Sequence, residues 1–265
     1  MAEVTQGSPA TQEPGTVVQL PGGLLKEGKV HRDAEILPMT GYTRKSIARE
    51  DVRTSPTKVT DMIFTQCLRR VGTYSINSRI LDELLSGDRD FLLMEIRRVS
   101  MGSTVRAEVE CEGCRKRLGV TFDLSEINVK RLEDKEYEII EVDGAGAMAF
   151  RMNTDKGVKA LCRFSRGLEQ KAVVPMFEKN AIAASYKLYT SCLLEWNGQA
   201  GPFAPDFFDG LSLPAIDSFA EAFTERQPGP DFKQETDCPS CGKKIQFTFR
   251  NSDFLFPLPK QRETI

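Results

Sequence analysis

The chain has 265 residues, of which 40% are hydrophobic and 28% charged, a composition ordinary for a globular protein. Its 36 basic and 38 acidic residues give a formal net charge of −2, which argues against a protein that coats nucleic acid through a general basic excess. No apolar run approaches the roughly 18–20 residues that span a bilayer, and the start of the chain lacks the basic and apolar stretches of a secretory signal. The chain has seven cysteines but only one histidine, and this imbalance restricts the kinds of catalytic and metal site that it can form.

The first predicted region, residues 1–40, is an extended N-terminal arm, because its first 20 residues are rich in glycine, proline, threonine and glutamine. The single histidine, His31, lies here in a polar stretch, and we interpret it as a solvated residue. A catalytic mechanism with a histidine base would have to use it. The lack of a second histidine also excludes histidine-rich metal sites, so a bound metal would need sulfur ligands.

A helical region is predicted over residues 41–102. Pro56 suits the first turn of one helix, and Asn77 can cap a second. Asp88 is predicted to cap a third helix, which is apolar around most of its circumference and therefore expected to be buried. Glycine at position 102 ends the region.

Two Cys-x-x-Cys pairs, Cys111 with Cys114 and Cys238 with Cys241, share one local pattern. Each pair stands between two segments that alternate in hydrophobicity and carry β-branched or aromatic residues, which predicts two β-hairpins with the cysteines at their tips. The predicted strands are residues 105–109, 118–122, 232–236 and 245–249. Gly242 suits a sharp turn close to sulfur.

The two hairpins together predict a tetrahedral four-cysteine zinc site with Cys111, Cys114, Cys238 and Cys241 as ligands. Four thiolates leave no coordination position open for water, so this Zn²⁺ would be structural. A redox pair, an iron centre and the absence of metal stay open as alternatives. An odd number of cysteines without a secretory signal favours a reducing compartment. The other three, Cys67, Cys162 and Cys192, lie in helical patterns and are interpreted as buried thiols.

Basic residues follow both pairs and could offset the charge of the zinc thiolates: Arg115, Lys116, Arg117, Lys243 and Lys244. A nucleic-acid patch is the alternative interpretation. It is the weaker one, because no aromatic residues are interleaved with these side chains.

The segment between the hairpins, residues 126–229, is predicted to be an insertion whose ends return to one place. We expect a hairpin with strands at 137–142 and 147–152, and helices over 154–166, 175–196 and 214–226. The chain should close with an extended apolar tail over residues 253–265, where prolines prevent a helix.

Several short segments, taken in order, resemble one known family. They are Leu20-Pro21-Gly22-Gly23, Leu37-Pro38-Met39-Thr40-Gly41, Gly87-Asp88-Arg89-Asp90 with its helix, the Cys111 hairpin, Cys238-Pro239-Ser240-Cys241-Gly242 and the aromatic residues 254–257. This set is similar to the zinc-ribbon baseplate or hub assembly proteins of contractile-tailed bacteriophages and contractile injection systems, the T-even-type phage baseplate protein family. The resemblance implies an assembly component of a baseplate, which is either built into the hub or wedge or helps to assemble it. It would occur in the bacterial cytoplasm during assembly, and in a phage virion or injection particle.

The predicted fold is therefore α+β: a helical N-terminal region plus a zinc ribbon split into residues 103–125 and 230–252, with a mixed insertion between them. No catalytic motif of the HExxH, GxSxG, kinase or Walker A type occurs, so we expect a non-enzymatic protein. Its expected partners are other baseplate, hub or tail proteins, docked through the arm and the tail, with no small-molecule substrate. The alternative is a zinc-ribbon nucleic-acid-binding or transcription-associated adaptor.

Overall fold

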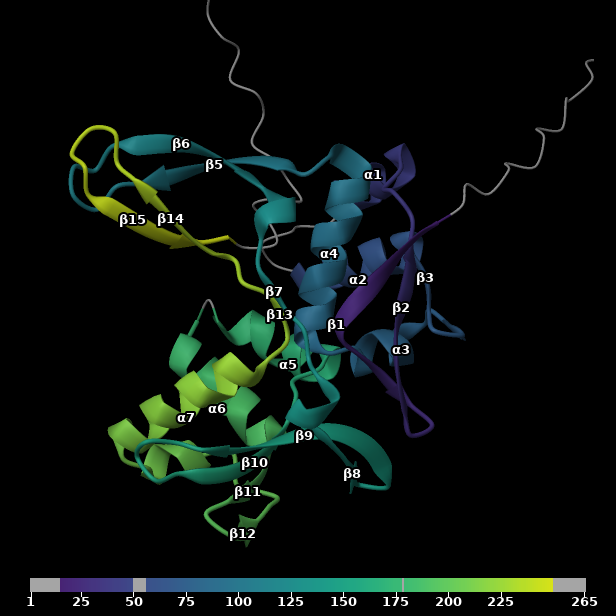
Figure 1. The fold of residues 1–265 in the computed structure, drawn as a ribbon, viewed down its shortest axis with the longest axis vertical. Helices are drawn as coiled ribbons and strands as arrows, with labels where there is room; N and C mark the ends of the chain where they lie inside the picture. The colour runs from purple at the N-terminus through teal and green to yellow at the C-terminus, as the bar shows by residue number, and fades with distance from the viewer. Residues whose placement is uncertain (1–14, 50–55, 178, 250–265) are drawn as a thin grey trace, which may run out of the picture.

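The computed structural model describes residues 15–49, 56–177 and 179–249 (Figure 1). Within these residues the protein is a mixed α+β fold with seven α-helices and several small sheets, which confirms the predicted class. Figure 1 shows three parts: one sheet with helices α1–α4, a second sheet with α5–α7, and a pair of hairpins that extends away from both.

The first sheet is built mainly from the N-terminal part of the chain. Strands β1 and β2 form a hairpin, and β3 and β4 continue the antiparallel sheet in sequence order. Leu20 and Leu24 on β1 and Ile36 on β2 are fully buried. Residues 16–36 thus belong to the packed body where the sequence predicted an extended arm, because their apolar side chains cover a helical layer. The strands are β1 (Thr16–Lys26), β2 (Lys29–Ile36), β3 (Leu68–Val71) and β4 (Tyr74–Ser75).

The helices that cover this sheet surround one long central helix, α4. As predicted, Pro56 begins α2, and the Asn77 side chain caps α3 by accepting a 3.0 Å hydrogen bond from the backbone N–H of Ile80. Phe91, Leu92, Leu93, Met94 and Ile96 of α4 are all buried, which confirms the expectation of a buried helix. The helices are α1 (Gly41–Ile47), α2 (Pro56–Cys67), α3 (Ser78–Glu83) and α4 (Ser86–Met101).

The second sheet is antiparallel, with the strand order β12-β11-β10-β9-β8, and it packs against α6 and α7, whereas α5 lies against α6 and α3. Its core is aromatic and includes the buried rings of Phe150, Phe164, Phe208 and Phe219. The β8–β9 hairpin and α7 confirm two of the predicted elements. The bounds are β8 (Glu138–Val142), β9 (Ala145–Asn153), β10 (Lys159–Arg163), α5 (Gly167–Phe177), α6 (Ala181–Cys192), β11 (Leu193–Trp196), β12 (Gln199–Ala200) and α7 (Leu213–Arg226).

The helix predicted over residues 154–166 is wrong, and the one predicted over 175–196 is correct only for α6, because β11 begins directly after it. The first range is a turn followed by β10, since Gly157 has a φ of +77° and the Thr154 hydroxyl accepts a hydrogen bond from the backbone N–H of Val158. The second range is divided at Asn180, whose side chain caps α6. Local turn chemistry overrides helical spacing at both places.

The hairpin pair consists of β5 (Thr104–Glu110) with β6 (Arg117–Asp123) and β14 (Lys233–Asp237) with β15 (Lys244–Thr248). All four strands were predicted. At the base of the hairpins, β7 (Val129–Lys130) pairs with β13 (Gly229–Pro230). This short ladder holds two segments together that are about 100 residues apart in the chain. Three-residue and four-residue 3-10 helices complete the fold: η1 (Leu124–Glu126), η2 (Asp134–Glu136) and η3 (Phe207–Gly210).

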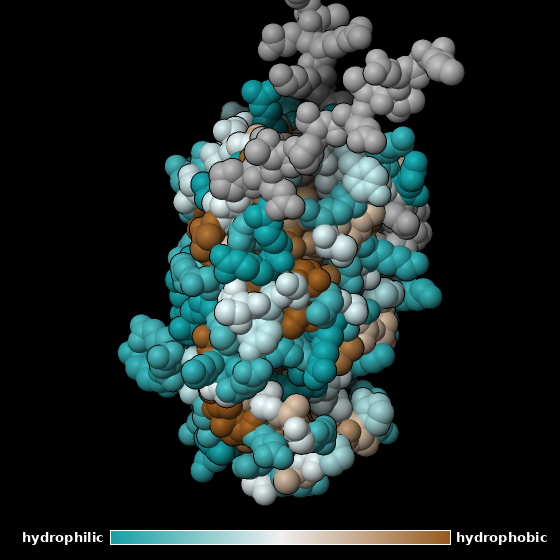
Figure 2. All heavy atoms as spheres, turned by 90° about the vertical axis from the view of Figure 1, so that its right-hand side faces the viewer, coloured by the Kyte–Doolittle hydropathy of each residue, from teal (hydrophilic) through white to brown (hydrophobic). Residues whose placement is uncertain are grey.

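The lone histidine is not a solvated residue. His31 lies on β2, partly buried, with its ring edge-on to Tyr74 at 5.1 Å between centroids. The face of the molecule in Figure 2 is mainly hydrophilic, with apolar residues in small separate groups. In the described ranges, no helix combines the length and apolar character that crossing a bilayer requires.

Candidate metal centre

The structure brings the four predicted ligands together, from pairs that are more than 120 residues apart in the chain. The sulfur atoms of Cys111, Cys114, Cys238 and Cys241 all lie within 4.8 Å of one another. The Cys111–Cys241 and Cys114–Cys238 sulfur distances are both 3.7 Å, and none of these thiols is in a disulfide. Sulfurs bound at about 2.3 Å in a regular tetrahedron lie about 3.8 Å apart, so the spacing of the cluster is compatible with a zinc site that has four cysteine ligands.

The two cysteine turns have the same backbone geometry. In the first, the N–H of Cys111 donates to the carbonyl of Lys116 and the N–H of Arg115 donates back to the carbonyl of Cys111. In the second, Cys238 and Gly242 make the equivalent bonds. Arg115 and Gly242 both have positive φ, at +60° and +70°. The repeat seen in the sequence is thus a repeat in structure, with an arginine in the first turn where the second has glycine.

Backbone N–H groups, not basic side chains, face the sulfurs of the second turn. Burial alone would raise the pKa of the Cys238 thiol, but the N–H groups of Ser240 and Cys241, together with the thiols of Cys241 and Cys111, lower it to about 6. The N–H of Lys243 also acts to lower the pKa of the Cys241 thiol, but the neighbouring thiols of Cys238, Cys111 and Cys114, together with burial, raise that pKa to about 11. Such donors stabilise thiolates, the form in which cysteine binds metal.

Three of the five basic residues near the turns are paired with carboxylates. Arg115 lies 3.2 Å from Glu110, and Lys243 lies 3.7 Å from Glu112. Lys244 lies 2.5 Å from Glu235. These pairs neutralise much of the positive charge that a nucleic-acid patch would require.

Apolar contacts connect the hairpins along their length. Val109 and Leu118 of the first hairpin pack with Ile245 and Phe247 of the second. Nearer the base, the rings of Phe122 and Phe249 stack at 3.5 Å between centroids. These contacts alone form a very small apolar core between the two hairpins.

The remaining cysteines are buried and lie outside the cluster, and Cys162 lies close to Cys192. Cys67 ends α2 and Cys192 ends α6, whereas Cys162 lies on β10 and not in a helix as predicted. Burial raises the pKa of Cys67 to about 11 and that of Cys192 to about 12. These thiols stay protonated and act as small apolar side chains.

The Gly-Asp-Arg-Asp segment at the start of α4 makes contacts with distant parts of the chain, which the sequence analysis did not predict. Helix α4 starts at Ser86 with no side-chain cap, so the predicted capping role of Asp88 is wrong. The buried carboxylate of Asp88 instead accepts 2.7 Å hydrogen bonds from the backbone N–H groups of Gly22 and Gly23 on β1. Burial raises the pKa of Asp88 to about 6, although these two donors oppose the shift.

Arg89 connects α4 to three other helices. Its guanidinium, only 1% exposed, donates to Asp61 of α2 at 2.8 Å, to the Leu81 carbonyl of α3 at 3.0 Å and to Gln170 of α5 at 3.0 Å. At the other end of α4, the backbone N–H of Met39 donates to the Ser100 hydroxyl at 2.8 Å. Three of the short segments in the resemblance therefore meet on one helix, where they hold parts of the fold together.

The comparison with known families agrees with this picture. A family model described as T4 bacteriophage base plate protein matches residues 35–256. No curated protein and no solved structure matches the chain. The match spans most of the chain, including α4 and both cysteine hairpins, and it confirms the family resemblance. The chain therefore belongs to the T4 bacteriophage base plate protein family.

Proposed function

We propose that this protein is a non-enzymatic structural component of a contractile-tail baseplate, in its hub or wedge, folded around one structural zinc ion. The family match over residues 35–256 carries the baseplate role. Other baseplate, hub or tail proteins are its partners in this proposal. It would assemble in the bacterial cytoplasm and remain in the phage virion or injection particle.

The zinc ligands in this proposal are Cys111, Cys114, Cys238 and Cys241. The cluster's sulfur spacing and the backbone N–H donors to Cys238 support this assignment. Four thiolates would complete the tetrahedron and leave no position for substrate or water, so the ion would hold the fold and do no chemistry. Zinc would stiffen the projecting hairpins, which have little core of their own.

In this arrangement residues 103–125 and 230–252 form one split zinc ribbon, and residues 126–229 form the insertion between its halves. The β7–β13 ladder and the hydrogen bond from the Asp231 N–H to the Asn128 carbonyl support this division, since they hold the insertion's ends together. Docking through the chain termini is also part of the proposal, and residues 1–14 and 253–265 lie outside the described residues.

Purified particles provide the direct test. A tagged chain expressed during infection or particle production should co-purify with complete baseplates, and elemental analysis should find one zinc per copy of the chain. Presence only in assembly intermediates would make it an assembly factor. A zinc-containing chain that never associates with tail proteins, but binds nucleic acid in a salt-dependent manner, would support the adaptor alternative.

A further inference from the structure

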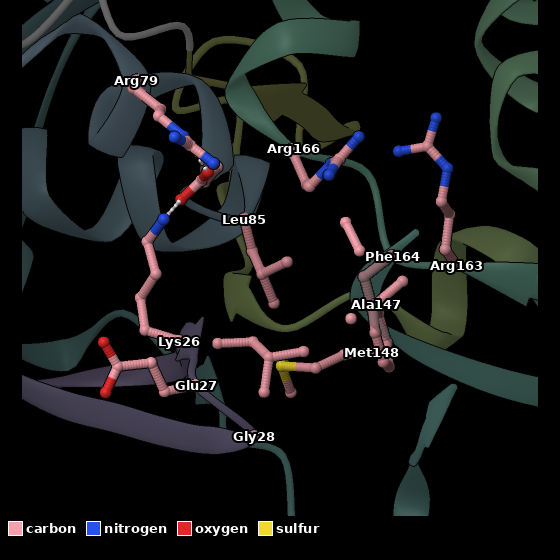
Figure 3. Close-up of a pocket in the computed structure, with 14 residues that line it drawn as sticks. Lys26, Glu27, Gly28, Arg79, Leu85, Ala147, Met148, Arg163, Phe164 and Arg166 are labelled. Carbon is pink, nitrogen blue, oxygen red and sulfur yellow. Dashed lines mark hydrogen bonds and ion pairs between the residues drawn. The ribbon is translucent and has the colours of Figure 1, made fainter. Parts of the chain in front are cut away.

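A pocket of about 250 Å³ opens where the two sheets meet, between the β1–β2 turn, α3 and strands β9 and β10. Figure 3 shows its residues. The deepest are apolar: Leu85, Met148 and Phe164 are each less than 5% exposed. A pocket for a drug-sized ligand usually measures roughly 300–1,000 Å³. This one is smaller and has room for a single large side chain.

The pocket is fixed in shape by backbone hydrogen bonds between its two sides. The N–H of Ser86 donates to the Ser165 carbonyl at 2.8 Å, and the N–H of Gly167 donates to the Leu84 carbonyl at 2.8 Å. Leu85 and Arg166 form a β-bridge between these bonds. The apolar floor is therefore preformed and does not require a conformational change to open.

Two groups of cations flank the floor, and in each group two cations share one carboxylate. On the α3 side, Lys26 and Arg79 both pair with Glu83, Arg79 at 3.0 Å. On the β10 side, Arg163 and Arg166 pair with Glu169 at 2.8 and 3.1 Å. Each group keeps one positive charge that its carboxylate does not balance.

The remaining acid at the pocket, Glu27, does not cancel this excess. Its carboxylate bonds to the Tyr74 hydroxyl and contributes to the raised pKa of that tyrosine. In Figure 3 the Glu27 carboxylate points away from Met148 and Phe164. Even with Glu27 counted, the lining carries a net positive charge on a protein whose overall charge is −2.

We propose that this pocket is a docking site for a peptide segment of a neighbouring protein, in which an aliphatic side chain is flanked by carboxylates. The apolar side chain fills the floor, and the carboxylates lie between the two cationic groups. Charge complementarity and the single-side-chain volume together select this partner over a neutral apolar segment or a simple anion. That the neighbour is a baseplate protein rests on the proposed function, but the pocket's chemistry does not.

Methyl NMR of the intact, zinc-loaded protein tests the proposal. With the eight methionine methyl groups labelled, the Met148 signal reports on the pocket floor. The probe is acetyl-aspartyl-leucyl-aspartyl amide. The expected result is a saturable shift of the Met148 methyl, with no comparable shift from the same peptide with asparagine for aspartate or with alanine for leucine.

A charge-reversal variant at the mouth of the pocket provides a second test, in which the affinity for the same peptide is measured. Arg79, with a side chain 82% exposed, can be replaced without disturbing a core, and Arg79→Glu should weaken the peptide's affinity by about tenfold. Arg44→Glu is the matched control, an exposed helical arginine outside the pocket, and should leave affinity unchanged.

Four results would overturn the proposal: no Met148 response, equal responses to the neutral or alanine peptide, the same saturable shift with inorganic phosphate, or equal losses in the two variants. None of these results bears on whether the chain is present in particles, so failure here is distinct from failure of the proposed function.

Discussion

Replacing Gly87 by alanine gives the clearest test of the packing around α4. Gly87 lies in the first turn of that helix, where an exposed glycine-to-alanine change would normally stabilise by about 1 kcal/mol. In this structure, however, a Cβ at position 87 would lie 1.7 Å from the carbonyl oxygen of Pro228 and 3.1 Å from the Cα of Gly229. The sign of the effect therefore distinguishes helix propensity from tertiary packing.

The magnitude follows from the required displacement. Real Cβ contacts are essentially never shorter than 3.0 Å, so the Pro228 carbonyl would have to move by about 1.3 Å. That movement disturbs β13, whose Gly229 approaches Gly87 so closely that a Cβ there would also collide. Overpacking of this kind costs about 1–3 kcal/mol or more. After the helix-propensity gain is subtracted, we expect a net loss of about 2 kcal/mol, or about 4–8 °C in melting temperature.

Thermal and urea unfolding measure this loss directly. Gly41→Ala is the matched control, since Gly41 lies in the first turn of α1 and a Cβ there would meet nothing within 4 Å. It should show the helix-propensity gain without the clash, and therefore stabilise the protein by up to about 1 kcal/mol. If Gly87→Ala melted at or above the parent temperature, the close approach of β13 to α4 would be refuted.

Three further predictions concern the metal centre and α4. Cys111→Ser should abolish stoichiometric zinc binding and lower the melting temperature, because structural zinc contributes roughly 10 kcal/mol to folding. Cys67 is about equally buried, and the Cys67→Ser protein should still bind zinc. Elemental analysis and calorimetry of the two variants test this. Gly242 has a φ of +70°, so Gly242→Ala should lower the free energy of unfolding by about 1 kcal/mol. Arg115 has a φ of +60° in the equivalent turn, so Arg115→Gly should raise it by about 0.5 kcal/mol. Effects of the same sign in chemical denaturation would contradict the shared geometry of the two turns. Burial raises the pKa of Asp88 from 3.8 to about 6, so the contribution of its protonated form to folding stability is full below about pH 4 and is lost as the pH rises through 6. The expected fall in the free energy of unfolding is about 3 kcal/mol. Asp88→Asn should remove this fall from the pH profile of unfolding, and an unchanged profile would contradict the prediction.

The features that the sequence predicted well are those with local causes. Each cysteine turn is closed by hydrogen bonds between residues at most five positions apart. The local spacing of Cys111 and Cys114, and of Cys238 and Cys241, was therefore enough to predict both hairpins. The Asn77 cap is local in the same sense. The helix predicted over residues 154–166 failed for a local reason too, since the turn at Gly157 carried a weaker signal than the apolar spacing around it.

The features that the sequence did not predict depend on partners far along the chain. Asp88 looked like a cap, but its partners are Gly22 and Gly23, which lie more than 60 residues earlier. Arg79 and Arg163 line the same cationic pocket although they are more than 80 residues apart in the chain. Neither residue belongs to a recognisable motif.

The sequence by itself determined the family, the α+β class and four cysteines in two matching hairpins, because these follow from short-range spacing and from ordered motifs. Only the tertiary structure decided that the four sulfurs meet, that residues 16–36 are core strands and that Arg89 joins four helices. The physical reason is burial: which polar groups must find partners away from water depends on how distant segments pack, and no local pattern specifies that.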